Sequence, residues 1–475
     1  MTFSYNRPQL AIVGAGPAGL GAALAARAAG LSVTVIDDQL EPGGQIWRAA
    51  GSALPIHADL MGPEYVLGRD RVTQFLASGA NYLPQHVLWH IETEDDGPVL
   101  HCAGPEGTRT IFPEKLLLAT GAVERPVPVP GWTLPGVMTA GGLQILLKSA
   151  QLSSDKAVLA GAGPLLWLLA AQMIAAGTPP LAVVECVGPS DYLAASWHMP
   201  SALRHAGPIT KGLGLIAKVR QAGVPICLSA KNLRVEGDVE ARALCFTDWR
   251  GKERRIEAEI VGLHGGVVPN QQASRLLRLP HSWNAAQHAF QPDRDADLRV
   301  QGGLYIAGDG ARVGGAEVAW LEGQMVGQQI AGEDVTATRR AISRANAVRP
   351  FLDRLYKPAK HLRTPTDQTI LCRCEAVTAG QIRQAARDGA PGPNQVKFML
   401  RAGMGPCQGR VCGLAVSEVI AESRGQDIRQ TGYFRIRPPL KPISLRLIAA
   451  DPDDGRAETD AGTGKTDKVL ALQTK

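Results

Sequence analysis

The stretch QLAIVGAGPAGLGAALAARAAGLSVTVID, residues 9–37, constrains the fold of this chain more than any other segment. A short apolar run leads into a Gly-x-Gly-x-x-Gly turn, an alanine-rich segment and a second apolar run that ends on Asp37. Gly14 permits the tight turn, Gly16 lets the backbone approach a pyrophosphate, and Gly19 lets a helix pack closely on the first strand. Phosphates then face the N–H groups at the positive end of that helix. The stretch therefore predicts a βαβ unit that binds a dinucleotide, with Asp37 placed to accept hydrogen bonds from an adenosine ribose.

Four later segments occur in an order that extends this unit into a larger body. They are PGGQIWR at 42–48, LLLATGAVERPVPVPG at 116–131, GGVVPN at 265–270 and GLYIAGDGA at 303–311. The ordered set resembles the flavoprotein reductases with two dinucleotide-binding domains, the class that includes thioredoxin reductase and ferredoxin reductases. The resemblance implies FAD at the first site and a contact between Asp309 and the ribityl or phosphate portion of the flavin. It adds four residues to that site: Gly44, Gln45, Thr120 and Gly121. The fingerprint alone is compatible with FAD or another adenine dinucleotide.

A second, weaker unit begins with AVLAGAGPLLWLLAAQMIAAG at 157–177 and ends its next apolar run on Glu185. Gly161 and Gly163 are present, but Leu166 replaces the third glycine and is expected to push the helix off the strand, which makes NAD(P) binding doubtful. If a nicotinamide nucleotide binds, Glu185 favours NAD over the 2′-phosphorylated form because like charges repel. The alternative is a fold retained without its ligand. No Cys-x-x-Cys lies beside either unit, so thioredoxin-reductase-like dithiol exchange is not expected.

Length and composition narrow the class of protein. A chain of 475 residues is too long for one ordinary core and predicts two or three domains. A hydrophobic content of 45%, a charged content of 20% and a net charge of +6 without long runs of one sign indicate a globular protein and no nucleic-acid partner. The N-terminus lacks the pattern of a signal peptide, and Gly-x-Gly-Pro breaks the uncharged stretch 157–177. We therefore expect no transmembrane segment and a cytoplasmic location, either free or peripheral at the inner membrane face.

Four of the eight cysteines form two pairs near the C-terminus. LCRCEAV contains Cys372 and Cys374, and GMGPCQGRVC contains Cys407 and Cys412. The intervening pattern predicts a helix that starts at a Thr378–Gln381 capping box and ends at Gly389. A second amphipathic helix is expected after Cys412. Two short helices with paired cysteines at their starts would place four thiolates around one point.

Three chemistries compete for these four thiols. A disulfide is disfavoured by the compartment and by the Cys-x-Cys spacing. Zinc suits any four-thiolate site, although structural zinc usually uses two-residue knuckles and often a histidine. An iron–sulfur cluster is favoured because it takes four cysteines and passes single electrons, whereas a flavin handles pairs. Glycines at 403, 405, 409 and 413 free backbone N–H groups for the sulfurs, and the candidates for offsetting cluster charge are Arg373, Lys397, Arg401 and Arg410.

The segment CRCEAVTAGQIRQAARDGA…NQVKFMLRAGMGPCQGRVC looks like the [2Fe-2S] module of the bacterioferritin-associated-ferredoxin type. Joined to the flavoprotein body and followed by RIRPPLKPISL, it is similar to the α (A) subunits of bacterial heteromeric amino-acid dehydrogenases. That family includes opine oxidases, D-hydroxyproline dehydrogenase, dye-linked proline dehydrogenases and hydrogen cyanide synthase. The resemblance covers residues 8–446 and implies a [2Fe-2S] cluster on the four cysteines.

The same resemblance implies partners. In such complexes the C–N bond of the substrate is oxidised on a separate β subunit, which is a glycine-oxidase-like flavoprotein. A small ferredoxin-like γ subunit is a further candidate partner, and FMN lies at the subunit interface in related assemblies.

The expected fold class is α/β: a flavoprotein with two Rossmann-like dinucleotide-binding domains and a small helical [2Fe-2S] module. Residues 1–150 and 290–335 are assigned to the FAD-type domain and 151–289 to the NAD-type domain. Residues 336–366 are a helical linker and 367–446 the cluster module. The polar tail 447–475 is predicted to be disordered.

Three functions are compatible with these features. The favoured one is an electron-transfer flavoprotein subunit of a dehydrogenase that oxidises an amino acid, imino acid or opine on a partner. The alternative is a free-standing NAD(P)H-dependent flavin or ferredoxin-type reductase, which needs a working site at Gly161 and Gly163. A binding or iron-storage partner without turnover is the third. No catalytic acid–base pair is evident, and His264 is the best candidate for a proton-abstracting residue, although a histidine beside a turn is more often structural.

Overall fold

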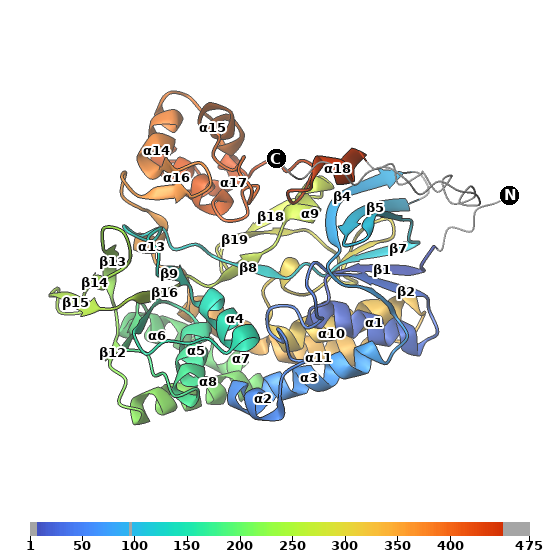
Figure 1. Ribbon diagram of the computed structural model, residues 1–475, viewed down its shortest axis with the longest axis horizontal. Helices are drawn as coiled ribbons and strands as arrows, with labels where there is room; N and C mark the ends of the chain where they lie inside the picture. Colours follow the sequence, from blue (N-terminus) through green and yellow to red (C-terminus); the bar gives the residue numbers. More distant parts are fainter. Residues whose placement is uncertain (1–6, 95–96, 450–475) are drawn as a thin grey trace, which may run out of the picture.

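The computed structural model describes residues 7–94 and 97–449, so residues 450–475, most of the tail predicted to be disordered, lie outside the described residues. Two mainly parallel sheets stand side by side, each with helices packed along it, and a small helical module sits on top of them (Figure 1). No helix within the described ranges is long and apolar enough to span a bilayer.

The first sheet has six strands in the order β20-β21-β7-β1-β2-β3, and only β20 runs antiparallel. The strands are β1 (Leu10–Val13), β2 (Val33–Ile36), β3 (Asn81–Leu83), β7 (Lys115–Leu118), β20 (Arg299–Gln301) and β21 (Leu304–Ile306). One face is covered by α1 (Pro17–Ala28), α3 (Pro63–Leu76) and α10 (Ala316–Ile330), and the other by the antiparallel strands β4 (Val87–Glu94), β5 (Gly97–Gly104) and β6 (Gly107–Ile111). Because both faces are covered, β1 and β2 are buried along their whole length, and Thr34 is their one polar residue.

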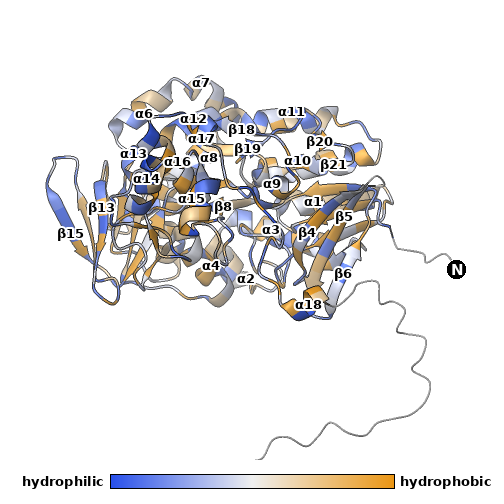
Figure 2. Cartoon of the chain, turned by 90° about the horizontal axis from the view of Figure 1, so that it is seen from above, coloured by the Kyte–Doolittle hydropathy of each residue, from blue (hydrophilic) through white to orange (hydrophobic). Residues whose placement is uncertain are grey.

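The second sheet has five strands in the order β12-β11-β10-β16-β9. They are β9 (Val137–Thr139), β10 (Ala157–Gly161), β11 (Ala182–Glu185), β12 (Ile226–Cys227) and β16 (Ile260–His264), with helices α4 (Ala140–Ala150), α5 (Pro164–Ala175) and α8 (Gly207–Gln221). Strand β9 pairs with β16, although it lies within the range 1–150 that the sequence analysis assigns to the first domain. An outer sheet of β13 (Lys231–Glu236), β14 (Ala243–Thr247) and β15 (Glu253–Glu257) ends in a polar edge strand (Figure 2).

The chain passes between the sheets through the antiparallel pair β8 (Ala122–Glu124) and β17 (Val267–Pro269). The remaining elements of the body are α2 (Pro55–Met61), α6 (Pro189–Ser196), α7 (Met199–Ala202), η1 (Leu203–His205), α9 (Gln272–Leu276), β18 (His281–Asn284), β19 (Ala289–Pro292) and η2 (Gly308–Gly310). The segment 336–366 contains α11 (Thr336–Ala345), η3 (Asn346–Val348), α12 (Arg349–Leu355) and α13 (Lys360–Arg363), so it is helical as the sequence predicts.

The C-terminal module starts with the hairpin β22 (Ile370–Cys372) and β23 (Val377–Thr378), and continues with α14 (Ala379–Arg387), α15 (Pro393–Leu400), α16 (Gly413–Arg424), α17 (Ile428–Thr431) and α18 (Leu445–Ala449). The predicted capping box is confirmed, because the Thr378 hydroxyl accepts from the Gln381 N–H at 3.3 Å and the Gln381 side chain accepts from the Thr378 N–H at 2.8 Å. The helix after Cys412 is confirmed as α16. Helix α15 is an addition that the sequence analysis did not foresee.

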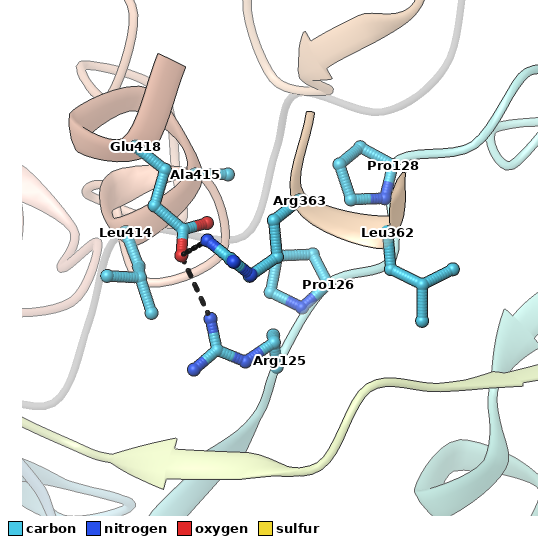
Figure 3. Close-up of a pocket in the computed structure, with 8 residues that line it drawn as sticks. All are labelled: Arg125, Pro126, Pro128, Leu362, Arg363, Leu414, Ala415 and Glu418. Atoms are coloured by element: carbon cyan, nitrogen blue, oxygen red, sulfur yellow. Dashed lines mark hydrogen bonds and ion pairs between the residues drawn. The ribbon is translucent and has the colours of Figure 1, made fainter. Parts of the chain in front are cut away.

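A buried carboxylate joins this module to the body. Oxygen Oε1 of Glu418, on α16, lies 3.6 Å from Arg125 and 3.5 Å from Arg363 (Figure 3). The same oxygen lies 3.0 Å from His288. The side chains of Glu418 and Arg125 are 6% and 5% exposed. Arg125 follows β8, so one carboxylate holds α16 against the strand that crosses between the sheets. A second contact joins the module to the body: the Trp132 indole N–H donates to the Ile370 carbonyl of β22 at 2.7 Å.

A buried lysine joins the two sheets of the body. The Lys148 ammonium, on α4, donates to the carbonyl of Gln45 at 3.1 Å and to that of Ile46 at 2.9 Å, both in the loop after β2. It also donates to Gln144 at 3.0 Å, and Gln144 donates to Gln172 of α5 at 2.8 Å. Burial lowers the pKa of Lys148 to about 7, assisted by the positive charge of Arg48.

Replacing Glu418 by Gln is expected to cost about 3–5 kcal/mol of unfolding free energy, because it leaves buried cations without their carboxylate. The matched control is Glu422→Gln on the same helix, whose side chain is 36% exposed and whose ion pair with Arg383 at 3.2 Å is expected to contribute at most about 1 kcal/mol. Denaturant unfolding of both variants measures the difference, and equal losses would contradict the role given to Glu418.

Lys148 makes stability depend on pH. Because its folded-state pKa is lowered towards 7 from an ordinary value of 10.5, the unfolded chain binds more protons between these values, and stability rises with pH across this window. We expect the stability of the wild type relative to Lys148→Met to rise by up to ~1.4 kcal/mol per pH unit there. Lys218→Met, at an exposed lysine of α8, is the control. A pH-independent difference between wild type and Lys148→Met would refute the assignment.

Candidate functional site

The first glycine turn leaves free the space that a phosphate would take. A Cβ on Gly14 would lie 2.4 Å from the Ala119 carbonyl oxygen, and one on Gly19 would lie 1.9 Å from the Gly14 oxygen, so both positions require glycine. A Cβ on Gly16, in contrast, would meet nothing nearer than the Gly44 Cα at 3.8 Å. The turn at the start of α1 is therefore tightly packed on the side of the sheet and open at Gly16.

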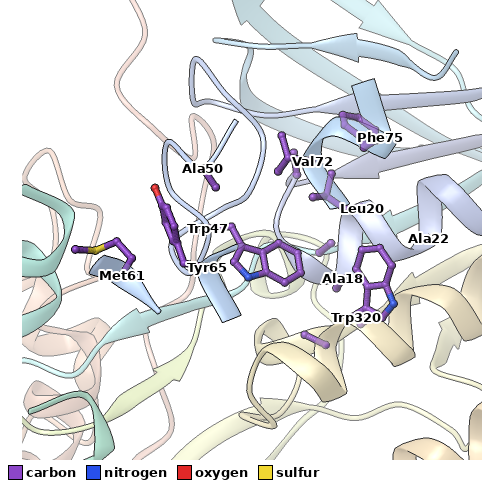
Figure 4. Close-up of a cluster of buried hydrophobic side chains, with 14 of the residues drawn as sticks. Ala18, Leu20, Ala22, Trp47, Ala50, Met61, Tyr65, Val72, Phe75 and Trp320 are labelled. Carbon is purple, nitrogen blue, oxygen red and sulfur yellow. The ribbon is translucent and has the colours of Figure 1, made fainter. Parts of the chain in front are cut away.

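The loop after β2 covers this turn. The Gly43 N–H donates to the Ala15 carbonyl at 2.7 Å, and a Cβ on Gly44 would lie 2.8 Å from the Gly16 Cα. Trp47 anchors the loop in the core, with its ring edge-on to Trp320 at a centroid distance of 6.1 Å (Figure 4). The carbonyl of Gln45 accepts from Lys148. The loop thus brings two predicted site residues, Gly44 and Gln45, to the open turn.

Asp37 stands at the end of β2 beside the same turn. Its carboxylate accepts from the Ala15 N–H at 2.5 Å and from the Gln39 N–H at 2.8 Å. Burial raises the pKa of Asp37, and these two hydrogen bonds oppose that shift. The carboxylate therefore orients the backbone of the glycine turn at the place where the fingerprint puts the ribose.

The remaining predicted residues of the first site lie at the ends of neighbouring strands. After β7, the Thr120 hydroxyl donates to the Asn270 carbonyl at 3.2 Å, and the Asn270 N–H donates to the Gly121 carbonyl at 3.0 Å. After β21, the Asp309 carboxylate accepts from the N–H groups of Gly314 and Gly315 at 2.8 and 3.0 Å, just before α10. Parallel strands β1, β7 and β21 end at the same edge, so the sheet brings these groups together where α/β proteins bind their ligands. These residues fit a dinucleotide.

The second glycine turn is built differently. A Cβ on Gly163 would lie 2.7 Å from the ring of His264, which is buried and contacts Glu124 through Nδ1. Glu185 is fully buried at the end of β11, and the Trp167 indole N–H donates to it at 3.2 Å. Leu166 is fully buried in the core, and α5 still packs on β10 and β11. The sequence analysis gave no role to Trp167, because it lies in an apolar helix. Its indole N–H acts as a hydrogen-bond donor only because the fold places it beside Glu185.

The structure brings the four C-terminal cysteines into one row of contacts. Cys374 contacts Cys407, Cys407 contacts Cys412, and Cys412 contacts Cys372. Cys372 and Cys412 are buried, whereas Cys374 is exposed, so the row runs from the interior to the surface. Hydrogen bonds from the Cys412 thiol lower the pKa of Cys372 to about 6 and that of Cys407 to about 5.

Backbone and glycines complete the cysteine site. Backbone N–H groups also bond the sulfurs: those of Gly403 and Glu375 at Cys372, and those of Gly409 and Val411 at Cys407. Cβ atoms at three glycines would meet the buried ring of Phe434 within 2.7–3.2 Å; they are Gly403, Gly409 and Gly413. The sequence analysis gave no role to Phe434, which directly precedes the segment RIRPPLKPISL.

Of the four predicted charge-balancing residues, two lie at the cysteines. Arg410 donates to the Cys407 carbonyl at 3.1 Å, and Lys397 lies close enough to Cys412 for that sulfur to raise its pKa against the lowering effect of burial. Arg401 pairs with Glu375 at 3.1 Å, and Arg373 stacks over Trp132 at 5.3 Å.

All eight cysteines are free thiols. Within residues 7–94 and 97–449, no three His, Cys, Asp or Glu side chains form a site for a single metal ion. The donor set consists of cysteine sulfurs alone, with N–H groups that polarise them, and each sulfur contacts at least one other. A two-iron cluster takes two thiolates on each iron, so this donor set fits such a cluster.

Comparison with protein families agrees with this division of the chain. Residues 8–323 match the family described as pyridine nucleotide-disulphide oxidoreductase, and residues 366–452 match the sarcosine oxidase A3 domain. The first match spans both sheets and the second spans the cysteine module. The chain is accordingly an FAD-dependent oxidoreductase with the predicted α/β fold.

Individual proteins extend the match over nearly the whole chain. The A subunit of opine oxidase from Rhizobium meliloti (strain 1021) is 42% identical over 92% of this chain and 97% of that protein. Hydrogen cyanide synthase subunit HcnB of Pseudomonas aeruginosa is 28% identical over 91% of this chain and 96% of that protein. The crystal structure of L-proline dehydrogenase from P. horikoshii shares the fold, with a TM-score of 0.67 at 16% identity over 93% of this chain and 79% of that one. The resemblance inferred from the sequence is confirmed, and the chain belongs to the family of the opine oxidase A subunits.

Proposed function

We propose that this chain is the electron-transfer flavoprotein subunit of a heteromeric dehydrogenase, with FAD at the first glycine turn and a [2Fe-2S] cluster on Cys372, Cys374, Cys407 and Cys412. The observation that carries the proposal is the row of four contacting thiols in a module fastened to a flavoprotein body. When bound, FAD supplies two-electron chemistry and the cluster supplies one-electron transfer.

The position of the cysteine loop supports electron transfer between the two groups. A small pocket at the junction is lined by Pro269 and Asn270 of the body and by Arg410 and Val411 of the cysteine loop. Asn270 is also the residue that bonds Thr120 and Gly121 at the flavin side. Glu418 fixes α16, and therefore the start of this helix at Cys412, relative to the same strand pair. The chain's own residues thus hold the two candidate sites at a constant separation.

The exposed end of the row gives the electrons an exit. Cys374 is exposed and Cys407 is partly exposed, whereas Cys372 and Cys412 are buried under Phe434 and α16. An acceptor protein or quinone would therefore approach from the side of Cys374. Backbone N–H groups at Cys372 and Cys407 favour the thiolate form that iron requires.

The names of the relatives support the substrate class. Opine oxidase, hydrogen cyanide synthase and sarcosine oxidase subunits all match over more than nine-tenths of this chain. We therefore infer a donor with a C–N bond, namely an amino acid, imino acid or opine, which is oxidised on a glycine-oxidase-like β subunit. The same proposal includes an FMN at the subunit interface and a small ferredoxin-like γ subunit.

Gly405 gives a sharp test of the cluster. A Cβ at this position would lie 2.3 Å from the Cβ of Cys374. The backbone of Gly405 is outside the left-handed region, so an alanine there would disturb the site through this contact and not through backbone strain. Gly405→Ala is therefore expected to displace one ligand and to lower iron and acid-labile sulfide by at least about half after anaerobic preparation, while FAD content is kept. The measurements are metal and sulfide assays together with electron paramagnetic resonance of the reduced protein.

Gly214→Ala is the matched control, because a Cβ there meets nothing within 4 Å. It is expected to keep the wild-type iron and sulfide content. Wild-type protein that contains zinc and no sulfide would end the [2Fe-2S] assignment, and normal iron and sulfide in Gly405→Ala would end the assignment of Cys374 as a ligand.

A further inference from the structure

The two glycine turns of this chain occupy equivalent places in two βαβ units, but their middle glycines differ in backbone conformation, with φ −80° at Gly16 and +140° at Gly163. Gly14 and Gly161 each lie against a backbone carbonyl. A Cβ added to Gly14 would lie 2.4 Å from the Ala119 oxygen, and one added to Gly161 would lie 1.8 Å from the His264 oxygen. The next glycines differ. The space beside Gly16 is open, whereas the space beside Gly163 is filled by the His264 ring at 2.7 Å. At the second turn, a side chain of the protein lies where a pyrophosphate would approach.

The acidic residues that end the second strands differ in the same way. Glu185 is fully buried, and its Oε1 accepts from the Trp167 indole at 3.2 Å, while its Oε2 has no hydrogen-bond partner in the structure. The Trp167 N–H also bonds the Tyr356 hydroxyl, which follows α12 in the linker. An adenosine ribose would have to displace both aromatic side chains to reach this carboxylate.

Helix α12 covers the region between the second glycine turn and Glu185. Its side chains Phe351 and Leu355 pack in one apolar cluster with Ala162, between the two glycines, and with Val187, just after β11. Phe351 is 8% exposed and Leu355 is 4% exposed. The helix lies beside α6 and α7 (Figure 2). The pyrophosphate and adenosine positions of a dinucleotide are therefore both occupied by the chain itself.

Polar contacts hold α12 and the preceding turn η3 in this place. The Ser201 hydroxyl of α7 donates to the Ala347 carbonyl of η3 at 2.8 Å. The amide of Gln287, between β18 and β19, donates to Asp353 of α12 at 3.3 Å and to the Val313 carbonyl at 2.7 Å. Arg349 contacts Asp353 within the helix. The covering helix is thus fixed to the body on two sides.

We propose that the second dinucleotide site is closed by the linker of the same chain, so that NADH and NADPH neither bind there nor reduce the flavin. Helix α12 and Tyr356 occupy the place of the nucleotide, and His264 occupies the place of its phosphates. The linker that carries the cysteine module therefore also removes nicotinamide nucleotides as electron donors, and the electrons enter from a partner subunit.

Nucleotide binding to the wild-type protein tests whether the second site is closed. Flavin-replete full-length chain is titrated with NADH, NADPH and ADP by calorimetry, and is mixed anaerobically with millimolar NADH in a stopped-flow instrument. We expect no saturable binding and no bleaching of flavin absorbance. Saturable binding of any of the three, or bleaching by NADH, would overturn the proposal.

The variant Phe351→Ala/Tyr356→Ala tests the element that closes the site. It removes both side chains without touching the glycines and, because the His264 ring stays in place, opens only the adenosine half of the site. We expect saturable binding of AMP or adenosine, with a Kd at least about tenfold below the highest concentration at which the wild type shows no binding. Arg354→Ala on the same helix is the matched control, because Arg354 faces Asp191 at 3.7 Å and is expected to leave the site closed. A flavin-replete double variant that still binds neither AMP nor adenosine would overturn the role of α12.

Truncation of two packed aromatic side chains is destabilising, so flavin content and the unfolding midpoint are measured for each variant. If the double variant loses its flavin, Tyr356→Ala alone is tested under the same criteria. Failure of this proposal differs from failure of the proposed function. Binding of NADH would leave the iron and sulfide content unchanged, and absence of a cluster would leave the closed site unchanged.

Discussion

Both candidate cofactor sites are built where the backbone comes closer to another group than a side chain would allow. At the first turn, Gly19 packs on the Gly14 carbonyl with no room for a Cβ, and the loop of Gly44 reaches the Cα of Gly16. In the cysteine module, Gly405 lies against Cys374, and three further glycines rest on Phe434. The rest of each site depends on these approaches, because they place backbone N–H groups where a phosphate would bind in one case and next to sulfur in the other.

The same constraint has opposite outcomes in the two βαβ units. A glycine turn provides space, and what fills the space decides the function. At Gly16 the space is left free and Asp37 orients the turn through Ala15. At Gly163 the space holds a histidine, and the neighbouring acid is turned inward to Trp167. Burial raises the pKa of Glu185 to about 7, so the group that would recognise a ribose loses much of its charge at neutral pH.

Local patterns predicted those parts of the structure whose partners are close in the sequence. The strand–turn–helix around Gly14, the Thr378–Gln381 cap and the helix after Cys412 are of this kind. Helix α15 was not predicted, because its eight residues start at a Gly-Pro step and bury only two side chains, too few for a periodic apolar pattern. Strand β9 is three residues long and can be recognised only from its pairing with β16.

The side chains that position the two sites could not be predicted from local sequence patterns. In the sequence, Glu418 and Lys148 look like ordinary charges on helices. Only the fold surrounds the first with two arginines and a histidine and buries the second among carbonyls. The closing of the second turn has the same origin, since Trp167 and Tyr356 come from separate parts of the chain. From the sequence, Leu166 was expected to weaken the second nucleotide site by displacing the helix. In the structure the leucine is accommodated in the core. The proposed obstruction comes from His264 and α12 instead. In this chain, the departure from the glycine fingerprint therefore does not itself obstruct the turn, and the side chains proposed to do so could be identified only from the fold.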